Sequence, residues 1–300
     1  MTFGMEGKGM KRVKTPIQRI KWVASVAGLA GVLTCVTTVR AQDNAVYRFS
    51  PVNQYGIELT ASYWNPIIDY VSTKSGVKLQ LKIGRTSADT TAYVLANEVE
   101  FVFSNHLFSP ERDHLGWKVF GRRATPPIRS QIVVLAESPV TRLEQLVNEA
   151  VAFPGPEATV AYKFSYANLL TQKIPVQVVF AGNMDGAFAQ LASGKVKAVG
   201  THSQLSAGWS KREGKAVRAL WESEPLNDLA LMAAKNVAPK DLAAVSKAFL
   251  EMAKDPVGQK VLTSASELVK LPAATAFVPS TGADYTAYRN FYQTAPASLR

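Results

Sequence analysis

The stretch at residues 153–162, FPGPEATVAY, places an acidic side chain where a strand gives way to a helix. The stretch at 147–153 predicts a buried strand, and Pro-Gly-Pro ends it before a helical segment. The first N–H groups of a helix have no partner within the helix and attract anions. Glu157 brings its own negative charge to this place. It is therefore either a first-turn acid that stabilises the helix dipole or a contact for a ligand that is not a simple oxyanion.

Three other polar residues lie near the ends of predicted strands, which is where α/β proteins bind their ligands. His106 follows the strand EFVFS, Asn183 follows VVFAG, and Tyr55 stands at the turn into the first helix. The ordinary structural alternatives are a hydrogen-bonded core histidine, a helix cap and a turn residue. We interpret all three as candidates for ligand contact.

The spacings of the common catalytic and cofactor sites are absent from residues 42–300. That part of the sequence has no His-Glu-x-x-His, Cys-x-x-Cys, Gly-x-Ser-x-Gly, phosphate loop or Gly-x-Gly-x-x-Gly. His106, His114 and His202 are far apart and no cluster of acids accompanies them, so we predict no metal site. We also predict no catalytic residue and no cofactor, while a triad assembled from distant residues stays open.

The elements that must position these residues alternate between strands and helices. Between residues 46 and 104, strands and helices follow each other in a pattern that predicts parallel strands with covering helices. The helical spacing of Trp64, Ile67 and Val71 predicts a helix that ends at Gly76. An extended run at 125–137 crosses into a second lobe with the same alternation, which includes a helix from 158 to about 172 and a strand at 195–199 that Thr201 and His202 follow. Another extended run at 221–234 returns to the first lobe. The layout predicts an α/β fold of two lobes, each a mostly parallel sheet flanked by helices, joined by two extended hinge strands. The predicted boundaries are 42–127 and 226–300 for a discontinuous first lobe, and 128–225 for the second.

The composition is that of a globular protein without a nucleic-acid partner. Of the 300 residues, 47% are hydrophobic and 19% are charged. The formal charge is +11, but residues 1–41 hold seven of the 34 Lys and Arg and one of the 23 acidic residues, which leaves +5 for the rest. Such a mild excess without a long basic run does not indicate nucleic-acid binding.

Residues 1–41 have the pattern of a secretory signal. The basic stretch KRVKTPIQRIK precedes an uncharged run at 22–39, and Val39 and Ala41 fit the small-residue rule for cleavage. The run is also marginal for a membrane span, so an uncleaved anchor is the less favoured alternative. Met10 is a second candidate start. Because the only cysteine, Cys35, lies in this run, cleavage after Ala41 leaves a chain without thiol chemistry.

The order of segments from residue 47 to about residue 265 resembles the phosphonate-binding family of periplasmic substrate-binding proteins. These proteins serve ABC transporters and share the type II periplasmic-binding-protein fold. The resembling stretches include EFVFSNHLFS, SQIVVLAESPVTRLEQL, VAFPGPEATVAY and VVFAGNMDGAFAQLASGKVKAV. The resemblance implies two lobes that close on a small ligand, and a periplasmic location.

The resemblance also implies the remaining site residues. In that family the second-lobe loop usually reads close to Pro-x-Ser-Thr-Ser-Gly and holds phosphonate oxygens, whereas here Pro156 and Glu157 replace hydroxyl and N–H donors. The first-lobe strand end, commonly Tyr-Gly-Pro or Tyr-Gly-Asn, reads Ser-Asn-His here. These departures predict an altered ligand that is neutral, zwitterionic or partly cationic. The full set of candidate ligand-binding residues is Tyr55, Ser104, Asn105, His106, Glu157, Ala158, Thr159, Asn183, Thr201 and His202.

The function expected from the sequence is that of a non-enzymatic, monomeric receptor for a small molecule, with an inner-membrane ABC permease as its partner. One alternative is a receptor that presents its ligand to the periplasmic domain of a sensor kinase. Another is an enzyme on the same fold, since a fold does not fix a function.

Overall fold

Helix α1 (Ile57–Ser75) shows how the sequence builds the first lobe. Its apolar residues recur at helical spacing, and Trp64, Ile67 and Val71 are buried. The ring of Trp64 packs on Phe49 of strand β1 (Val46–Pro51), with the ring centroids 4.9 Å apart. The helix ends at Gly76, whose φ of +68° is a left-handed conformation that glycine adopts without strain.

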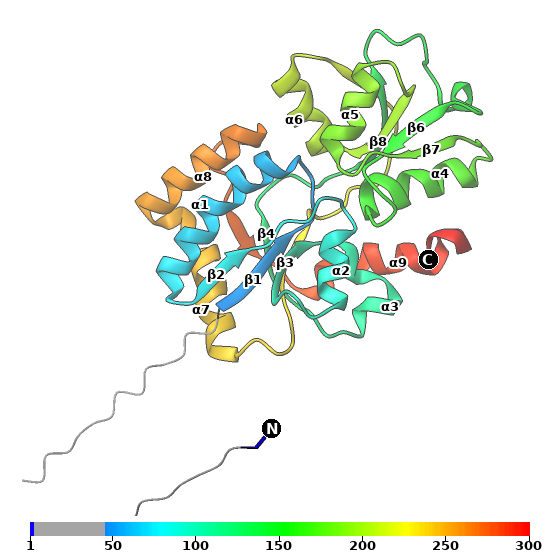
Figure 1. Cartoon of the computed structure of the whole chain (residues 1–300). Helices are drawn as coiled ribbons and strands as arrows, with labels where there is room; N and C mark the ends of the chain where they lie inside the picture. Colours follow the sequence, from blue (N-terminus) through cyan, green and yellow to red (C-terminus); the bar gives the residue numbers. More distant parts are fainter. Residues whose placement is uncertain (3–45) are drawn as a thin grey trace, which may run out of the picture. The chain divides into compact units, whose positions relative to one another are not determined.

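The computed structural model describes residues 1–2 and 46–300 (Figure 1). The predicted secretory signal, including the run at 22–39 and Cys35, therefore lies outside the described residues. Within the part of the chain that is described, no helix combines the length and the hydropathy needed to cross a membrane.

The first sheet has six strands, and the chain enters it twice. Besides β1, its strands are β2 (Lys78–Leu81), β3 (Phe101–Ser104), β4 (Lys118–Arg123), β10 (Ala230–Ala233) and β11 (Phe277–Pro279). Their order is β11-β4-β10-β3-β1-β2. Strand β1 pairs in parallel with β2 and β3, whereas β10 is antiparallel to both β3 and β4. The antiparallel strands belong to the segments before and after the excursion into the second lobe.

The second sheet is built from one continuous stretch of chain. Its strands are β5 (Ser130–Leu135), β6 (Ala150–Phe153), β7 (Gln177–Phe180), β8 (Ala198–His202) and β9 (Val217–Glu222). Their order is β7-β6-β8-β5-β9. Strand β6 pairs in parallel with β7 and β8, and β5 is antiparallel to β8 and β9. Each sheet thus combines the predicted parallel pairs with antiparallel strands next to the crossings between lobes.

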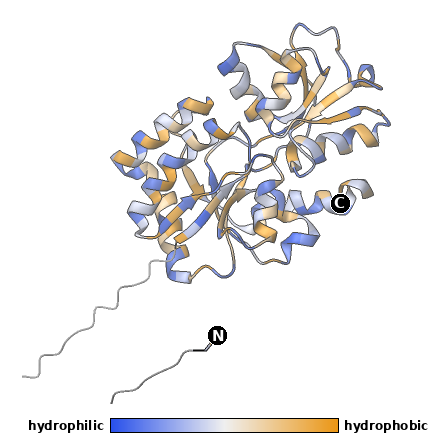
Figure 2. Ribbon diagram, viewed as in Figure 1, coloured by the Kyte–Doolittle hydropathy of each residue, from blue (hydrophilic) through white to orange (hydrophobic). Residues whose placement is uncertain are grey.

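Helices cover both sheets, and the strands between them are largely apolar (Figure 2). Phe101 and Phe103 of β3 pack in one cluster with α1, α7 (Pro239–Leu250) and α8 (Pro256–Val269), while Val102 packs in another with Phe108 and Tyr288. This alternation explains why a continuous apolar run forms a strand that is buried on both faces. The remaining helices are α2 (Asp89–Leu95), α3 (Pro110–Asp113), α4 (Ser165–Thr171), α5 (Met184–Ala192), α6 (Ser203–Glu213), α7 (Pro239–Leu250), α8 (Pro256–Val269) and α9 (Thr286–Thr294).

The two crossings between the sheets lie side by side. The N–H of Ile128 donates to the carbonyl oxygen of Leu226 over 2.8 Å, and the N–H of Leu226 donates back over 2.7 Å. Both side chains are buried. The extended runs at 125–137 and 221–234 therefore come together as a pair of backbone segments.

Three local features differ from the sequence reading. Strands β4 and β11 were not predicted, because neither stretch shows a clear apolar alternation and both depend on pairing with distant strands. Strand β8 begins at Ala198 rather than at Lys195, so Thr201 and His202 are part of the strand instead of following it. The helix expected at 158–172 begins as a wider π-helical segment, η3 (Thr159–Phe164), before it continues as α4.

The start of η3 lies directly on strand β8, and Gly200 makes this approach possible. A side-chain carbon at Gly200 would come within 2.4 Å of the carbonyl oxygen of Ala161 and within 2.3 Å of the Phe153 ring. A residue without a side chain is therefore needed under the first turn of η3. This contact brings Thr159, Val160 and Ala161 to the strand end that carries His202.

Candidate functional site

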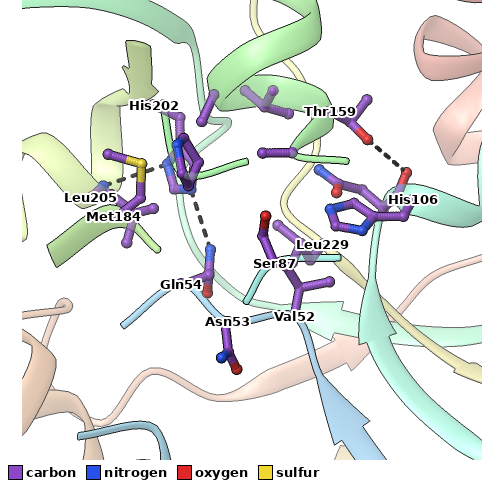
Figure 3. A pocket seen from close by; sticks show the side chains of 15 residues that line it. Val52, Asn53, Gln54, Ser87, His106, Thr159, Met184, His202, Leu205 and Leu229 are labelled. Atoms are coloured by element: carbon purple, nitrogen blue, oxygen red, sulfur yellow. Dashed lines mark hydrogen bonds between the residues drawn. The ribbon is translucent and has the colours of Figure 1, made fainter. Parts of the chain in front are cut away.

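A small cavity lies where strand ends of the two lobes meet (Figure 3). Its volume is about 30 Å³. The first lobe contributes the loop after β1 and the residues that follow β3, and the second lobe contributes the start of η3 and the end of β8. This is smaller than the usual volume of a small-molecule pocket, which is about 300–1,000 Å³.

The lining of the cavity is polar in places but has no formally charged side chain. None of the 15 residues that line it is Asp, Glu, Lys or Arg. Eight of them are apolar, and the polar ones are Asn53, Gln54, Ser87, Asn105, His106, Thr159 and His202. A few polar groups among apolar walls are typical of a small-molecule site.

His106 is a buried, neutral side chain at the cavity wall. Its Nδ1 lies 3.0 Å from the hydroxyl oxygen of Thr91, and Figure 3 shows its ring beside the cavity. Burial lowers the pKa of His106 to about 3, with Glu157 opposing the shift and Arg112 and Lys163 adding to it. At neutral pH the ring is uncharged and can donate from only one nitrogen.

His202 faces His106 from the other lobe and is also neutral. Its Nε2 lies 3.2 Å from Nε2 of Gln54, and the N–H of Leu205 approaches its Nδ1 at 3.4 Å. Burial lowers the pKa of His202 to about 4. A neutral imidazole has one acceptor nitrogen, so it satisfies only one of these two donors. The pair of His202 and Gln54 joins the two lobes at the cavity.

Two side chains that line the cavity carry polar atoms without a hydrogen-bond partner. Asn53 donates from Nδ2 to the carbonyl oxygen of Gly84 over 2.5 Å, but its Oδ1 has no partner. The hydroxyl of Ser87 has none either. Both side chains are buried, at 2% and 1% exposed. Because buried polar groups are nearly always paired, these two buried atoms stand out among the side chains that line the cavity.

Half of the candidate residues from the sequence meet at this cavity, and half lie elsewhere. Asn105, His106, Ala158, Thr159 and His202 line it, and the Thr159 hydroxyl donates across the lobes to the carbonyl oxygen of Asn105 over 3.4 Å. The candidates outside the lining are Tyr55, Ser104, Glu157, Asn183 and Thr201.

The five outlying candidates have structural partners of their own. The Tyr55 ring packs under the guanidinium of Arg212, with 5.4 Å from Cζ to the ring centroid. Ser104 accepts from the N–H of His106, and Asn183 caps helix α5 by accepting from the N–H of Gly186 over 2.9 Å. Thr201 is buried in β8. Glu157 forms an ion pair that is described below.

A buried charge network lies behind the cavity. Arg123, at the end of β4, is 0% exposed and donates to the Asp228 carboxylate from Nε over 2.7 Å and from Nη2 over 3.2 Å. The same Nη2 donates to Oε1 of Gln54 in the first lobe and to Oε1 of Gln204 in the second. Burial alone would lower the pKa of Arg123, but the neighbouring Asp228 raises it well above its usual value. The guanidinium thus links Gln54, which lines the cavity in the first lobe, to Gln204 in the second lobe.

Sequence reasoning missed Asn53, Gln54, Ser87 and Arg123. Asn53 and Gln54 follow strand β1, so the strand-end rule that singled out His106 could have found them. Ser87 and Arg123 carry no comparable signal, because their places depend on contacts with residues far away in the chain. Ser87, for example, is held by a hydrogen bond from its N–H to the carbonyl oxygen of Gly182 in the other lobe, over 3.0 Å.

No group of three or more His, Cys, Asp or Glu suited to a metal ion occurs among the described residues.

Two mixed sheets, each flanked by helices, with a partly polar cavity at facing strand ends, define the class of two-lobed α/β binding proteins. The chain belongs to the family of phosphonate periplasmic substrate-binding proteins of ABC transporters, whose model matches residues 49–285. This is a family of substrate-binding receptors and not of enzymes.

Solved structures share the fold at low sequence identity. A binding-protein component of a phosphonate ABC transporter from Pseudomonas aeruginosa is 13% identical over 84% of this chain and 87% of its own, with a TM-score of 0.69. A Prochlorococcus marinus protein in complex with methylphosphonate is also 13% identical, over 83% of this chain and 96% of its own, with the same TM-score. A chloride-bound protein from Xanthomonas citri is 14% identical over 83% and 96%, with a TM-score of 0.64. No curated protein matches the sequence.

Proposed function

We propose that this receptor holds a small polar ligand without net charge, rather than a phosphonate, and delivers it to an inner-membrane ABC permease. The observation that carries the proposal is the lining of the cavity, which has no charged side chain and includes Asn53, whose buried Oδ1 has no hydrogen-bond partner. A deprotonated phosphonate has only acceptor oxygens, so it would leave this acceptor unpaired and bring uncompensated charge into the site. A ligand with at least one hydrogen-bond donor complements it.

The receptor acts by binding alone, as a monomer, and closes over its ligand. The hinge consists of the paired crossings at Ile128 and Leu226, and we place the lobe boundaries at 42–127 with 226–300 and at 128–225. A periplasmic sensor domain is the alternative partner. The contact residues in this proposal are those that line the cavity from both lobes, namely Asn53, Gln54, Ser87, Asn105, His106, Thr159 and His202.

The test of this proposal is to purify the protein gently from its own host and to identify the retained ligand by native mass spectrometry. We expect an uncharged molecule of low mass, and we expect Asn53→Ala to weaken its rebinding by about 10- to 100-fold, because a buried hydrogen bond is lost. Asn183→Ser is the matched control, because Asn183 does not line the cavity and serine can also cap helix α5. A retained phosphonate, or an unchanged affinity in Asn53→Ala, would contradict the proposal.

We further propose that the mature receptor begins at Gln42. The support is the signal pattern of residues 1–41, which suits export to the periplasm. The expected result is an intact mass that matches residues 42–300 for protein taken from the periplasmic fraction. A mass that includes the run at 22–39, found in the membrane fraction, would show an anchored protein instead.

A further inference from the structure

An ion pair spans the two lobes beside the cavity. Glu157 lies between β6 and η3 in the second lobe, and Arg112 lies on helix α3 in the first. Nη1 of Arg112 is 2.5 Å from Oε2 of Glu157, and the two side chains are only 13% and 22% exposed. The neighbours of this pair line the cavity on both sides, namely His106, Ala158 and Thr159.

The surroundings of Glu157 are rich in positive charge. Arg112 also donates from Nη1 to the carbonyl oxygen of His106 over 3.2 Å. Lys163 is buried, with its Nζ 5.1 Å from the centroid of the Tyr292 ring, and it forms no ion pair among the described residues. Burial alone would raise the pKa of Glu157, but the hydrogen bond from Arg112 and the positive charges of Arg112 and Lys163 lower it. Glu157 is therefore ionised at neutral pH, and it is the carboxylate that forms the ion pair with Arg112.

We propose that Glu157 is a built-in counter-ion that determines ligand specificity. Its carboxylate takes the partner that an anionic ligand would need, Arg112, and its own charge repels such a ligand from the adjoining cavity. Specificity of this kind arises from a repulsive element as much as from an attractive one. The same carboxylate joins the lobes, so closure does not depend on the charge of a ligand.

The proposal goes beyond the identity of the native ligand, because it concerns the rejection of anions. Removal of the carboxylate leaves Arg112 without its ion-pair partner and Lys163 without one of its neighbouring acids, in a partly buried place where charge interactions are stronger than in water. The changed protein should then bind an anion in the position of the lost carboxylate. The gain must require Arg112.

The experiment measures the binding of inorganic phosphate and of methylphosphonate by calorimetry at low salt. We expect no measurable binding by the unchanged protein at millimolar concentrations, and at least tenfold tighter binding by Glu157→Gln. Glu157→Ser is measured in parallel, so that either folded variant decides the question. The double variant Glu157→Gln with Arg112→Gln should lose the gain. Glu144→Gln, which removes an exposed acid in the second lobe from the short helix η2 (Leu143–Leu146), is the control for overall charge.

Three results would overturn the proposal. The first is a folded Glu157 variant that binds phosphate no better than the unchanged protein. The second is an equal gain in Glu144→Gln, which would indicate a general effect of net charge. The third is submicromolar phosphate binding by the unchanged protein. The first two results leave the proposed function standing, whereas the third would contradict it as well, so the two kinds of failure can be told apart.

Discussion

Replacement of Asp228 by alanine is expected to lower the free energy of unfolding by about 3–5 kcal/mol, because it leaves a buried positive charge without its partner. Arg123 is 0% exposed, and two of its nitrogens donate to the Asp228 carboxylate. The same carboxylate also accepts from the Leu229 N–H and the Thr125 hydroxyl. Urea unfolding with an unchanged slope measures the loss.

The matched control for Asp228 is an exposed ion pair of the same kind. Asp113 accepts from Arg289 through two hydrogen bonds of 2.9 and 2.8 Å, but its side chain is 42% exposed. Water screens such a pair, so Asp113→Ala should cost less than about 1 kcal/mol. The double variant Arg123→Met with Asp228→Leu should recover much of the loss, since it removes both charges. A loss below 1 kcal/mol in Asp228→Ala would mean that Arg123 finds another partner.

Acidification is expected to destabilise the protein well before its carboxylates titrate. His106 and His202 have pKa values lowered to about 3 and about 4, whereas an unfolded histidine titrates near 6.5. Well above pH 6.5 the two histidines are neutral in the folded and in the unfolded protein, so they give the free energy of unfolding no dependence on pH. Below pH 6.5, the unfolded chain binds two protons that the folded protein does not, so stability falls as the pH falls towards 4. The slope is about 2.7 kcal/mol per pH unit for the two groups together.

Unfolding measured between pH 7 and pH 5 tests this expectation. The charged groups near His106 are Glu157, Arg112 and Lys163, and those near His202 are Asp228 and Arg123. The double variant His106→Gln with His202→Gln should flatten the slope over this range. His114→Gln is the control, because His114 is exposed and lies away from the cavity. A flat profile in the unchanged protein would show that the two rings accept protons in the folded state.

Local patterns sufficed for much of the fold. The spacing of Trp64, Ile67 and Val71 predicted helix α1, and Gly76 correctly marked its end. Strand β4 was missed because it depends on β10 and β11, which lie more than 100 residues further along the chain. Its sequence alone does not distinguish it from a loop.

The candidate site was predictable where topology alone decides position. His106 was expected near a cleft because a strand ends beside it, and the structure places it at the cavity wall. The interpretation of Glu157 could not be settled from the sequence, because its partner, Arg112, lies 45 residues away and in the other lobe. The same holds for Arg123 and Asp228, which are separated by 105 residues. Pairings of this kind arise from the assembled fold and leave no local periodicity.

The order of strands in the two sheets has a consequence for the way the chain folds. All five strands of the second sheet come from one uninterrupted stretch, so that sheet needs no residue after β9 in order to form. The first sheet begins earlier in the chain but needs β10 and β11 from its last third. Until they arrive, β3 lacks the neighbour that covers its edge and its apolar side chains stay exposed to other chains. The sheet that contains the first strands of the chain is therefore the last to be completed. Its long-range pairing is slow, so this is the stage of folding at which aggregation is most favoured.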